Sequence, residues 1–281
     1  MTQLSGSRDI GQLKKQARTV RTEILKMLTE AGSGHTGGSL SAADIVTALY
    51  FCKMRHNPKD PVWKERDRFI LSKGHAAPLL YTALALSGYF DKSLLKTLRK
   101  IGSPLQGHPC SKLLPGVEIS TGSLGQGLSI ANGIAMGLRM DGLNSRVYCL
   151  LGDGETQEGQ VWEAAMSASH YRLDNICAII DNNGLQIDGP CCDVMALEPI
   201  VDKWAAFGWH VIDIDGHKMG AVLDALDEAG TVKGKPTMIV ARTVKGKGVS
   251  FFEGKVQYHG MAPTSEELGK ALKELEDIDN G

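Results

Sequence analysis

The sequence predicts an α/β domain in which a mostly parallel sheet carries helices on both faces. The main observation is a strand–helix–strand unit within residues 146–189: apolar runs at Val147–Leu151 and Ile176–Ile180 flank helix-forming residues at Gln157–Tyr171. A crossover of this length joins parallel neighbours, so the carboxyl ends of both strands meet at one edge of the sheet. Open α/β sheets bind their ligands at that edge.

The rest of the chain continues the alternation of strands and helices, which is the second observation that predicts this fold class. Ser41 and Asp44 have the spacing of a capping box and predict a helix start. Because no repeat or linker interrupts the pattern, we expect one domain over residues 1–281. The expected helices are Asp9–Ala31, Ser41–Phe51, Ala76–Leu86, Asp91–Ile101, a small-residue helix within 120–140, Met219–Ala229 and a fraying Ser265–Asp279, and the expected strands are Arg68–Leu71, Trp209–Ile214 and Thr237–Val244.

Composition limits the classes of function. The 281 residues are 42% hydrophobic and 22% charged, which is typical of a soluble globular protein. A net charge of -1 gives no indication of a nucleic-acid or membrane partner. The first residues lack an apolar signal core, and no apolar run approaches the roughly 18 residues of a membrane span. We therefore expect a cytoplasmic protein with its six cysteines reduced.

A Gly-Asp-Gly turn follows the first strand of the central unit, and Asn182 and Asn183 follow the second. Alone, such a tripeptide is a common turn. Asp153 and Asn183, however, place hard oxygen ligands on neighbouring strand ends, an arrangement that suits Mg²⁺. The adjacent Gly154 lets a phosphate approach the backbone and the helix start. The sequence therefore predicts a diphosphate held through a metal ion.

Four of the eight histidines stand beside glycine in expected loops at the edge of the sheet where ligands bind. Taken singly, a loop histidine is more often an ordinary surface residue. As a set, they are candidates for a functional site at that edge. They are His35, His75, His108 and His259. His56, His170 and His210 carry no such signal, and His217, in Asp-Gly-His, is expected to be a loop or cap residue.

Together these motifs resemble the transketolases. The Gly-Asp-Gly and Asn-Asn pair is similar to the thiamine diphosphate fingerprint, and Gly-His-Thr-Gly-Gly, Ser-Lys-Gly-His, Gln-Gly-His-Pro, Ser-Thr-Gly-Ser-Leu-Gly-Gln-Gly and Lys-Gly-Lys-Gly occur in the family's order. The resemblance covers about Asp9 to Leu272 and is closest to the N-terminal subunit of split transketolases. Thr36 departs from it, since the family usually has proline there.

The resemblance implies a role for each matching residue in a diphosphate-binding (PP-type) domain. Mg²⁺, with Ca²⁺ or Mn²⁺ as substitutes, is expected on Asp153, Asn183 and the Leu185 carbonyl. Glu163 matches a glutamate at the family's subunit interface. Contacts with thiamine diphosphate are implied for His75, Gly122, Ser123, Leu124, Asp153, Gly154, Glu158, Asn183, Lys245 and His259, and catalytic roles for His35, His75, His108, His259 and Glu158.

The implied reaction transfers a two-carbon ketol group from a ketose phosphate to an aldose phosphate, in the pentose phosphate pathway or a specialised one. A glutamate on a pyrimidine-binding domain is also required, and the chain ends at Gly281, soon after the last histidine motif. We therefore expect a heterotetramer with a C-terminal partner subunit. Alternatives are half of a deoxyxylulose phosphate synthase, a decarboxylating 2-oxo acid dehydrogenase component, a subunit with a specialised sugar acceptor, and a non-catalytic binding module.

Overall fold

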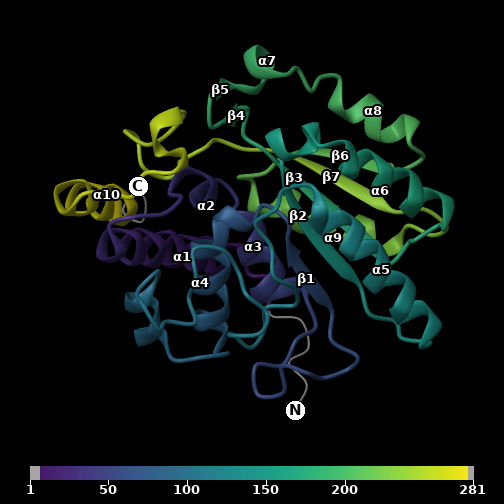
Figure 1. The fold of residues 1–281 in the computed structure, drawn as a ribbon, viewed down its shortest axis with the longest axis horizontal. Coiled ribbons are helices and arrows are strands. Elements are labelled where there is room, and N and C mark those ends of the chain that lie inside the picture. Colours follow the sequence, from purple (N-terminus) through teal and green to yellow (C-terminus); the bar gives the residue numbers. More distant parts are fainter. Residues whose placement is uncertain (1–6, 278–281) are drawn as a thin grey trace.

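The computed structural model describes residues 7–277 and contains a five-stranded parallel sheet in the order β1-β2-β3-β7-β6. A two-stranded antiparallel hairpin, β4–β5, lies beyond the end of β3 (Figure 1). The predicted fold class is confirmed. The strands are β1 Arg68–Leu71, β2 Val147–Gly152, β3 Ile176–Asn182, β4 Leu185–Gln186, β5 Gly189–Pro190, β6 His210–Asp215 and β7 Thr237–Arg242.

Helices cover both faces of the sheet (Figure 1). Within residues 7–277, none of them combines the length and apolar character needed to cross a lipid bilayer. The α-helices are α1 Ile10–Ala31, α2 Gly37–Ser41, α3 Ala43–Ala48, α4 Ala77–Ser87, α5 Gln126–Met140, α6 Gly159–His170, α7 Cys191–Val194, α8 Ile200–Ala206, α9 Met219–Thr231 and α10 Ser265–Asp277. A π-helix spans Leu49–Lys53, and 3-10 helices span Gly74–Ala76, Lys92–Thr97, Gly154–Gln157 and Val256–His259.

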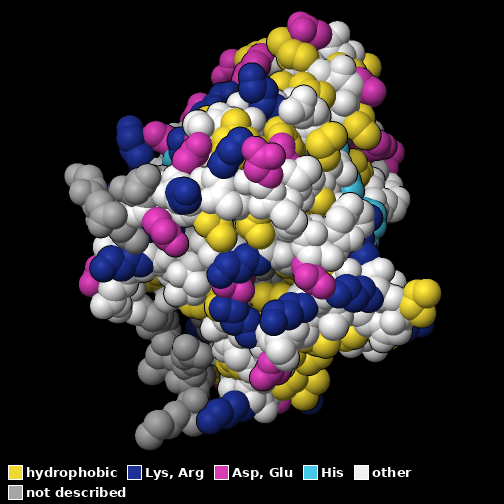
Figure 2. Space-filling model, turned by 90° about the vertical axis from the view of Figure 1, so that its left-hand side faces the viewer, with side chains coloured by type: hydrophobic (Ala, Val, Ile, Leu, Met, Phe, Trp, Pro, Cys, Tyr) yellow, Lys and Arg dark blue, Asp and Glu magenta, His cyan; other side chains and the backbone are white. Residues whose placement is uncertain are grey.

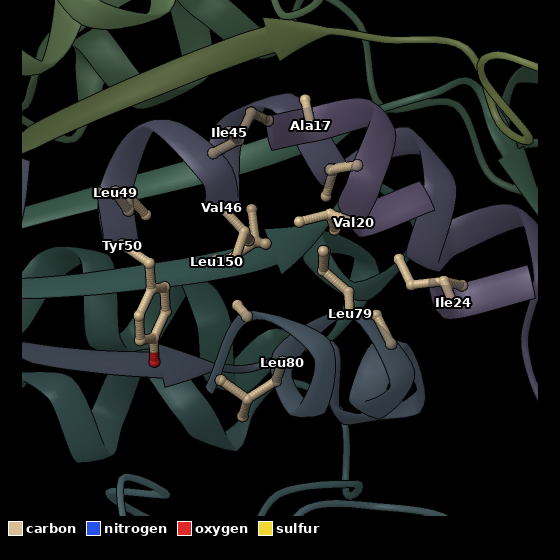
Figure 3. Close-up of a cluster of buried hydrophobic side chains, with 14 of the residues drawn as sticks. Ala17, Val20, Ile24, Ile45, Val46, Leu49, Tyr50, Leu79, Leu80 and Leu150 are labelled. Atoms are coloured by element: carbon tan, nitrogen blue, oxygen red, sulfur yellow. The ribbon is translucent and has the colours of Figure 1, made fainter. Parts of the chain in front are cut away.

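The core consists of two layers, one on each face of the sheet. In β2, Tyr148 and Leu150 point into the layer formed with α1, α3, α4 and α9, and Cys149 and Leu151 point into the layer formed with α5, α6 and α8. Figure 3 shows Leu150 among side chains of α1, α3 and α4, including Val20. Because both faces are buried, the strands read in the sequence as continuous apolar runs.

The expected capping box at Ser41 is wrong. The chain turns helical earlier, at Gly37, and Ser41 is the last residue of α2. The Ser41 hydroxyl donates to Asp181 Oδ2 at 2.6 Å, and Asp44 is ion-paired with Arg21 at 2.6 Å. Both side chains therefore bond to residues far along the chain and do not cap a helix. The helical conformation continues after α3 as the π-helix.

The helix expected at Asp91–Ile101 is also wrong in length and type, since only a 3-10 helix forms at Lys92–Thr97. Asp91 does cap it, accepting from Ser93 N at 2.8 Å. The chain then leaves helical geometry because Arg99 has a φ of 59° and donates its N–H to Leu105 O. The sequence predicted neither the β4–β5 hairpin nor α7 and α8. Helix α10 is confirmed as far as Asp277; the rest of the expected helix lies outside the described residues.

The face that carries α1 and α10 mixes charges of both signs (Figure 2). Between these helices and the Lys92–Thr97 segment lies a groove whose rim carries Lys26, Lys92, Glu23 and Glu30. Lys92 pairs with Glu23 at 3.0 Å; the lysine is half exposed and the glutamate largely buried. Since salt can reach the lysine, the pair is partly screened.

Candidate functional site

A cavity of about 300 Å³ lies at the carboxyl ends of β2 and β3. Gly152 pairs with Asp181 in the parallel register, so the residues that follow the two strands stand side by side. This is the sheet edge at which the sequence predicts a ligand. Of the predicted residues, the cavity brings together His75, Leu124, Asp153, Gly154, Glu158, Asn183, Leu185, Lys245 and His259.

Asp153 is 2% exposed and lies at the floor of this cavity. Its Oδ1 accepts from Gly154 N at 2.8 Å and its Oδ2 from Gly184 N at 2.5 Å. Burial, together with the charge of Asp181, raises the pKa of Asp153 to about 6 despite these hydrogen bonds. The carboxylate therefore lacks a full counter-charge, and a bound cation would stabilise it.

Two further oxygen donors stand beside this carboxylate. Asn183 Oδ1 accepts from Leu185 N at 3.2 Å, and the Leu185 carbonyl accepts from Lys245 Nζ at 2.7 Å. The Leu185 carbonyl oxygen is therefore already in contact with a cationic group, the Lys245 ammonium. Within residues 7–277 no three His, Cys, Asp or Glu side chains form a metal-binding group. The donor set is thus one carboxylate and two neutral oxygens, which fits a hard divalent cation that keeps several waters or phosphate oxygens.

Two lysines make the neighbouring wall of the cavity cationic. Burial, followed by the charge of Lys73, lowers the pKa of Lys245 to about 8. Lys245 Nζ also lies 2.9 Å from His259 Nδ1. Lys73 is 1% exposed and pairs with the carboxylate of Asp181, with its Nζ 3.0 Å from Gly38 O. Two buried ammonium groups at one wall favour an anionic ligand.

The four predicted histidines form one cluster. Ring centroids of His35 lie 5.1 Å from His75, 6.3 Å from His108 and 5.6 Å from His259. Burial, and after it the charges of nearby lysines and Arg99, lowers the pKa of all four, to about 4 for His35 and about 3 for His259. The imidazoles are therefore neutral near pH 7, each with one donor and one acceptor nitrogen. His35 Nδ1 is buried without a partner.

The remaining histidines lie outside this cluster. His56 Nε2 is 2.8 Å from Tyr50 O, and His210 pairs with Glu228. His217 sits in a loop, where its Nδ1 contacts Asp44 at 2.9 Å and its Nε2 accepts from Val244 N at 2.8 Å. His170 is exposed at the end of α6.

Thr36, at the position where the resemblance leads us to expect proline, makes a tertiary hydrogen bond. Its buried hydroxyl donates to Met261 O at 2.6 Å. This bond ties the segment that carries His35 to the segment that carries His259. Proline has no donor for this contact.

The segment 121–125 packs against the histidines. Gly122 adopts a φ of 144°, and a Cβ there would lie 3.0 Å from the ring of His108. A Cβ on Gly74, beside His75, would meet Gly122 N at 2.6 Å. The backbone can therefore approach this closely only because both positions lack a side chain. Ser123 is exposed, and Leu124 is 37% exposed at the mouth of the cavity.

Glu155 is a cavity residue that the sequence did not reveal. It is 3% exposed and accepts from Gly125 N at 3.0 Å, from Gly152 N at 2.9 Å and from the Ser72 hydroxyl. Burial raises the pKa of Glu155 in spite of these bonds. The only signal was its place directly after Gly-Asp-Gly. Glu158, by contrast, is exposed at the cavity rim.

Glu163 does not line the cavity. It is exposed on the first turns of α6, one turn beyond Glu158. The structure therefore separates the two predicted glutamates into one at the rim and one on the helix surface. Lys73 and Asp181, which do contribute to the site, were not predicted to do so.

Comparison with known proteins places these features in one family. The model of the family "Transketolase, thiamine diphosphate binding domain" matches residues 13–277. The chain is 48% identical over 264 residues to 6-deoxy-6-sulfo-D-fructose transketolase subunit SqwG of Clostridium sp. (strain MSTE9), covering 94% of this chain and 96% of that one. It is 41% identical over 263 residues to one subunit of the apulose-4-phosphate transketolase of Phocaeicola vulgatus, covering 94% and 93% of the two chains.

Solved structures agree with the sequence relatives. The transketolase of Campylobacter jejuni superposes with a TM-score of 0.90 at 38% identity, covering 95% of this chain and 43% of that chain. The chain thus spans less than half of that transketolase and nearly all of the two subunits. The resemblance to the N-terminal subunit of split transketolases is confirmed. The chain belongs to the transketolase family and forms its thiamine diphosphate-binding domain.

Proposed function

We propose that this chain is the diphosphate-binding subunit of a two-chain transketolase that moves a two-carbon ketol group from a ketose phosphate to an aldose phosphate. The observation that carries the proposal is the meeting, in one cavity, of the Asp153 carboxylate, two lysines and the clustered histidines His75 and His259, against which His35 packs. The lysines would bind the anionic groups of the cofactor, and the histidines would bind the hydroxyl groups of the sugar.

The cavity residues fit a metal ion and thiamine diphosphate. Asp153, Asn183 and the Leu185 carbonyl would hold Mg²⁺, or Ca²⁺ or Mn²⁺ in its place, and Lys245 and His259 would face the diphosphate. The 122–124 segment would lie against the aminopyrimidine, with Leu124 on its ring. When bound, the cofactor supplies a nucleophilic thiazolium carbon.

The histidines would act on the sugar. A neutral imidazole can accept from one hydroxyl and donate to another, so the cluster can orient a polyol without adding charge. During cleavage and formation of the carbon–carbon bond, His35, His75, His108 and His259 would move protons to and from the oxygens of the substrate.

We propose that the partner is a pyrimidine-binding C-terminal subunit, and that two such heterodimers form the assembly. The two relatives named above are each one chain of a transketolase, which supports the first part. The pairing of two heterodimers is supported by the general rule that oligomers adopt closed symmetry, most often with a two-fold axis. Glu158 at the cavity rim would lie near the cofactor, and Glu163 on the helix surface would lie at the subunit interface.

The substrates proposed are open-chain sugars with a distal anionic group. The names of the two relatives contain a sulfo sugar and a sugar phosphate, which supports an anion at the distal end without fixing its kind. A central pentose phosphate role and a specialised one both remain compatible with the site. All six cysteines are free thiols, which supports a reducing cytoplasm.

The test is a steady-state assay with Mg²⁺, thiamine diphosphate, a ketose phosphate and an aldose phosphate, with and without the C-terminal subunit. We expect turnover only with both subunits, and none with Asp153→Ala. Turnover on the order of 1 per second by this chain alone would exclude the two-chain assignment. Release of carbon dioxide when pyruvate is supplied would favour the alternatives, half of a deoxyxylulose phosphate synthase or a decarboxylating 2-oxo acid dehydrogenase component.

A further inference from the structure

A buried ion pair lies directly behind the proposed metal donors. Asp181 is 0% exposed and Lys73 is 1% exposed, and their side chains are in contact. The electrostatic attraction within a fully buried ion pair roughly offsets the free energy that its two charges lose by desolvation. A net gain in stability therefore does not explain why this pair is buried here. Its hydrogen bonds indicate another role.

The carboxylate of Asp181 is surrounded by donors on both oxygens. Oδ1 accepts from the Thr243 hydroxyl. Oδ2 accepts from Lys73 Nζ, from Ser41 Oγ at 2.6 Å and from Asn183 Nδ2 at 3.3 Å. Among these donors Asn183 alone belongs to the proposed metal site.

This contact orients the Asn183 amide from its NH₂ side. Asn183 Nδ2 donates to Asp181 Oδ2 at 3.3 Å, so the amide turns its NH₂ group toward Asp181. Its Oδ1 then faces the opposite side, where it lies 3.2 Å from Leu185 N. The inverted amide would present NH₂ donors to a cation, which repel it.

We propose that Asp181, held as a carboxylate by Lys73, is a positioning residue that fixes the amide of Asn183 with its oxygen toward the divalent cation. The inference rests on the proposed function, since it concerns one of the proposed metal donors. Partners behind a metal ligand typically change metal affinity by about 10–100-fold when they are removed.

The test measures Mn²⁺ binding to the assembled enzyme in the presence of thiamine diphosphate, by electron paramagnetic resonance of free Mn²⁺. Asp181→Asn can either donate or accept toward Asn183, so we expect the Mn²⁺ dissociation constant to rise about 10–100-fold. The matched control is Thr243→Val, which removes the contact with Oδ1 only. We expect its dissociation constant to stay within about threefold of the parent value, inside the scatter of such measurements.

A double variant separates amide orientation from general damage. In Asp181→Asn with Asn183→Asp, the ligand is a carboxylate whose two oxygens are equivalent, so no wrong orientation exists. The net charge of the pair is also unchanged. We expect this exchange to recover most of the lost affinity. Lys73→Met with Asp181→Asn, which leaves no unpaired buried charge, replaces the single variant if that variant does not fold, and we expect the same loss.

The outcomes distinguish the inference from the function on which it rests. If the parent enzyme binds Mn²⁺ and Asp181→Asn binds it equally well, the positioning role is refuted and the proposed function stands. The same holds if the exchange variant binds no better than Asp181→Asn. If the parent enzyme binds no Mn²⁺, both the metal site and the inference fall.

Discussion

The stability of the metal-free chain should depend on pH through the buried histidines, and His35 is the sharpest case. Burial lowers its pKa from 6.5 to about 4. The unfolded chain then takes up a proton near pH 6.5, whereas the folded chain does so only near pH 4. His35 therefore contributes stability above pH 6.5, and this contribution is lost as the pH falls from 6.5 to about 4.

The size of the effect follows from this difference. At pH 5, which is about 1.5 below the unfolded pKa, protonation stabilises the unfolded chain by about 2 kcal/mol, since each pH unit corresponds to about 1.4 kcal/mol. Because the ring is partly exposed to solvent, we expect about 1–2 kcal/mol. Replacing His35 by glutamine should remove this contribution, so the variant should lose less stability on acidification than the parent.

The assay is urea unfolding of the parent chain and His35→Gln at pH 8 and pH 5, without metal or cofactor. The difference in unfolding free energy between the two should shift by about 1–2 kcal/mol in favour of the variant at pH 5. His170→Gln, at an exposed position outside the cluster, is the matched control. If the difference in unfolding free energy between parent and variant is equal at pH 8 and pH 5, the pKa of His35 is the same in the folded and unfolded chains, and the reasoning is refuted.

Four further predictions concern the site and its support. Asp153→Ala should abolish binding of metal and thiamine diphosphate in calorimetry, whereas alanine at each clustered histidine should lower the transfer rate and leave the melting temperature within a few degrees. Gly127→Ala should destabilise the fold by about 1–3 kcal/mol in urea unfolding, because its Cβ would lie 2.3 Å from Ser72 Oγ. Asp44→Asn should cost about 3–5 kcal/mol in the same assay, because it leaves the buried Arg21 without its counter-ion.

The parts of the fold and site that the sequence predicted have local signatures. The apolar runs of β2 and β3 end at Gly-Asp-Gly and Asp-Asn-Asn, so Asp153 and Asn183 could be placed at one sheet edge by topology alone. The histidines were found as a set through their glycine neighbours and the resemblance. The structure confirms that they converge, at centroid distances of 5.1–6.3 Å from His35.

The parts that the sequence missed depend on partners far along the chain. Asp181 follows the apolar run of β3 and Glu155 lies in the polar turn after β2, and a charged residue at either place is more often solvent-exposed. Their burial is set by contacts such as that of Ser41 with Asp181, 140 residues apart. The same cause misled the capping-box prediction, since Ser41 and Asp44 have the right spacing for a cap but bond to distant groups.

The site has two neighbouring regions, one with the charged lysines and one with the neutral histidines. In the proposed function Lys245, with the Lys73–Asp181 pair beside it, would supply positive charge to a diphosphate, whereas a polyol would be held best by neutral groups that both donate and accept. The same lysines serve both needs, because their charges add to burial in lowering the pKa of His259 to about 3 and that of His35 to about 4. A protonated imidazole would be repelled by the cations that hold the anion. Placing the lysines beside the histidines therefore keeps the rings uncharged and available for proton transfer with sugar hydroxyls at neutral pH.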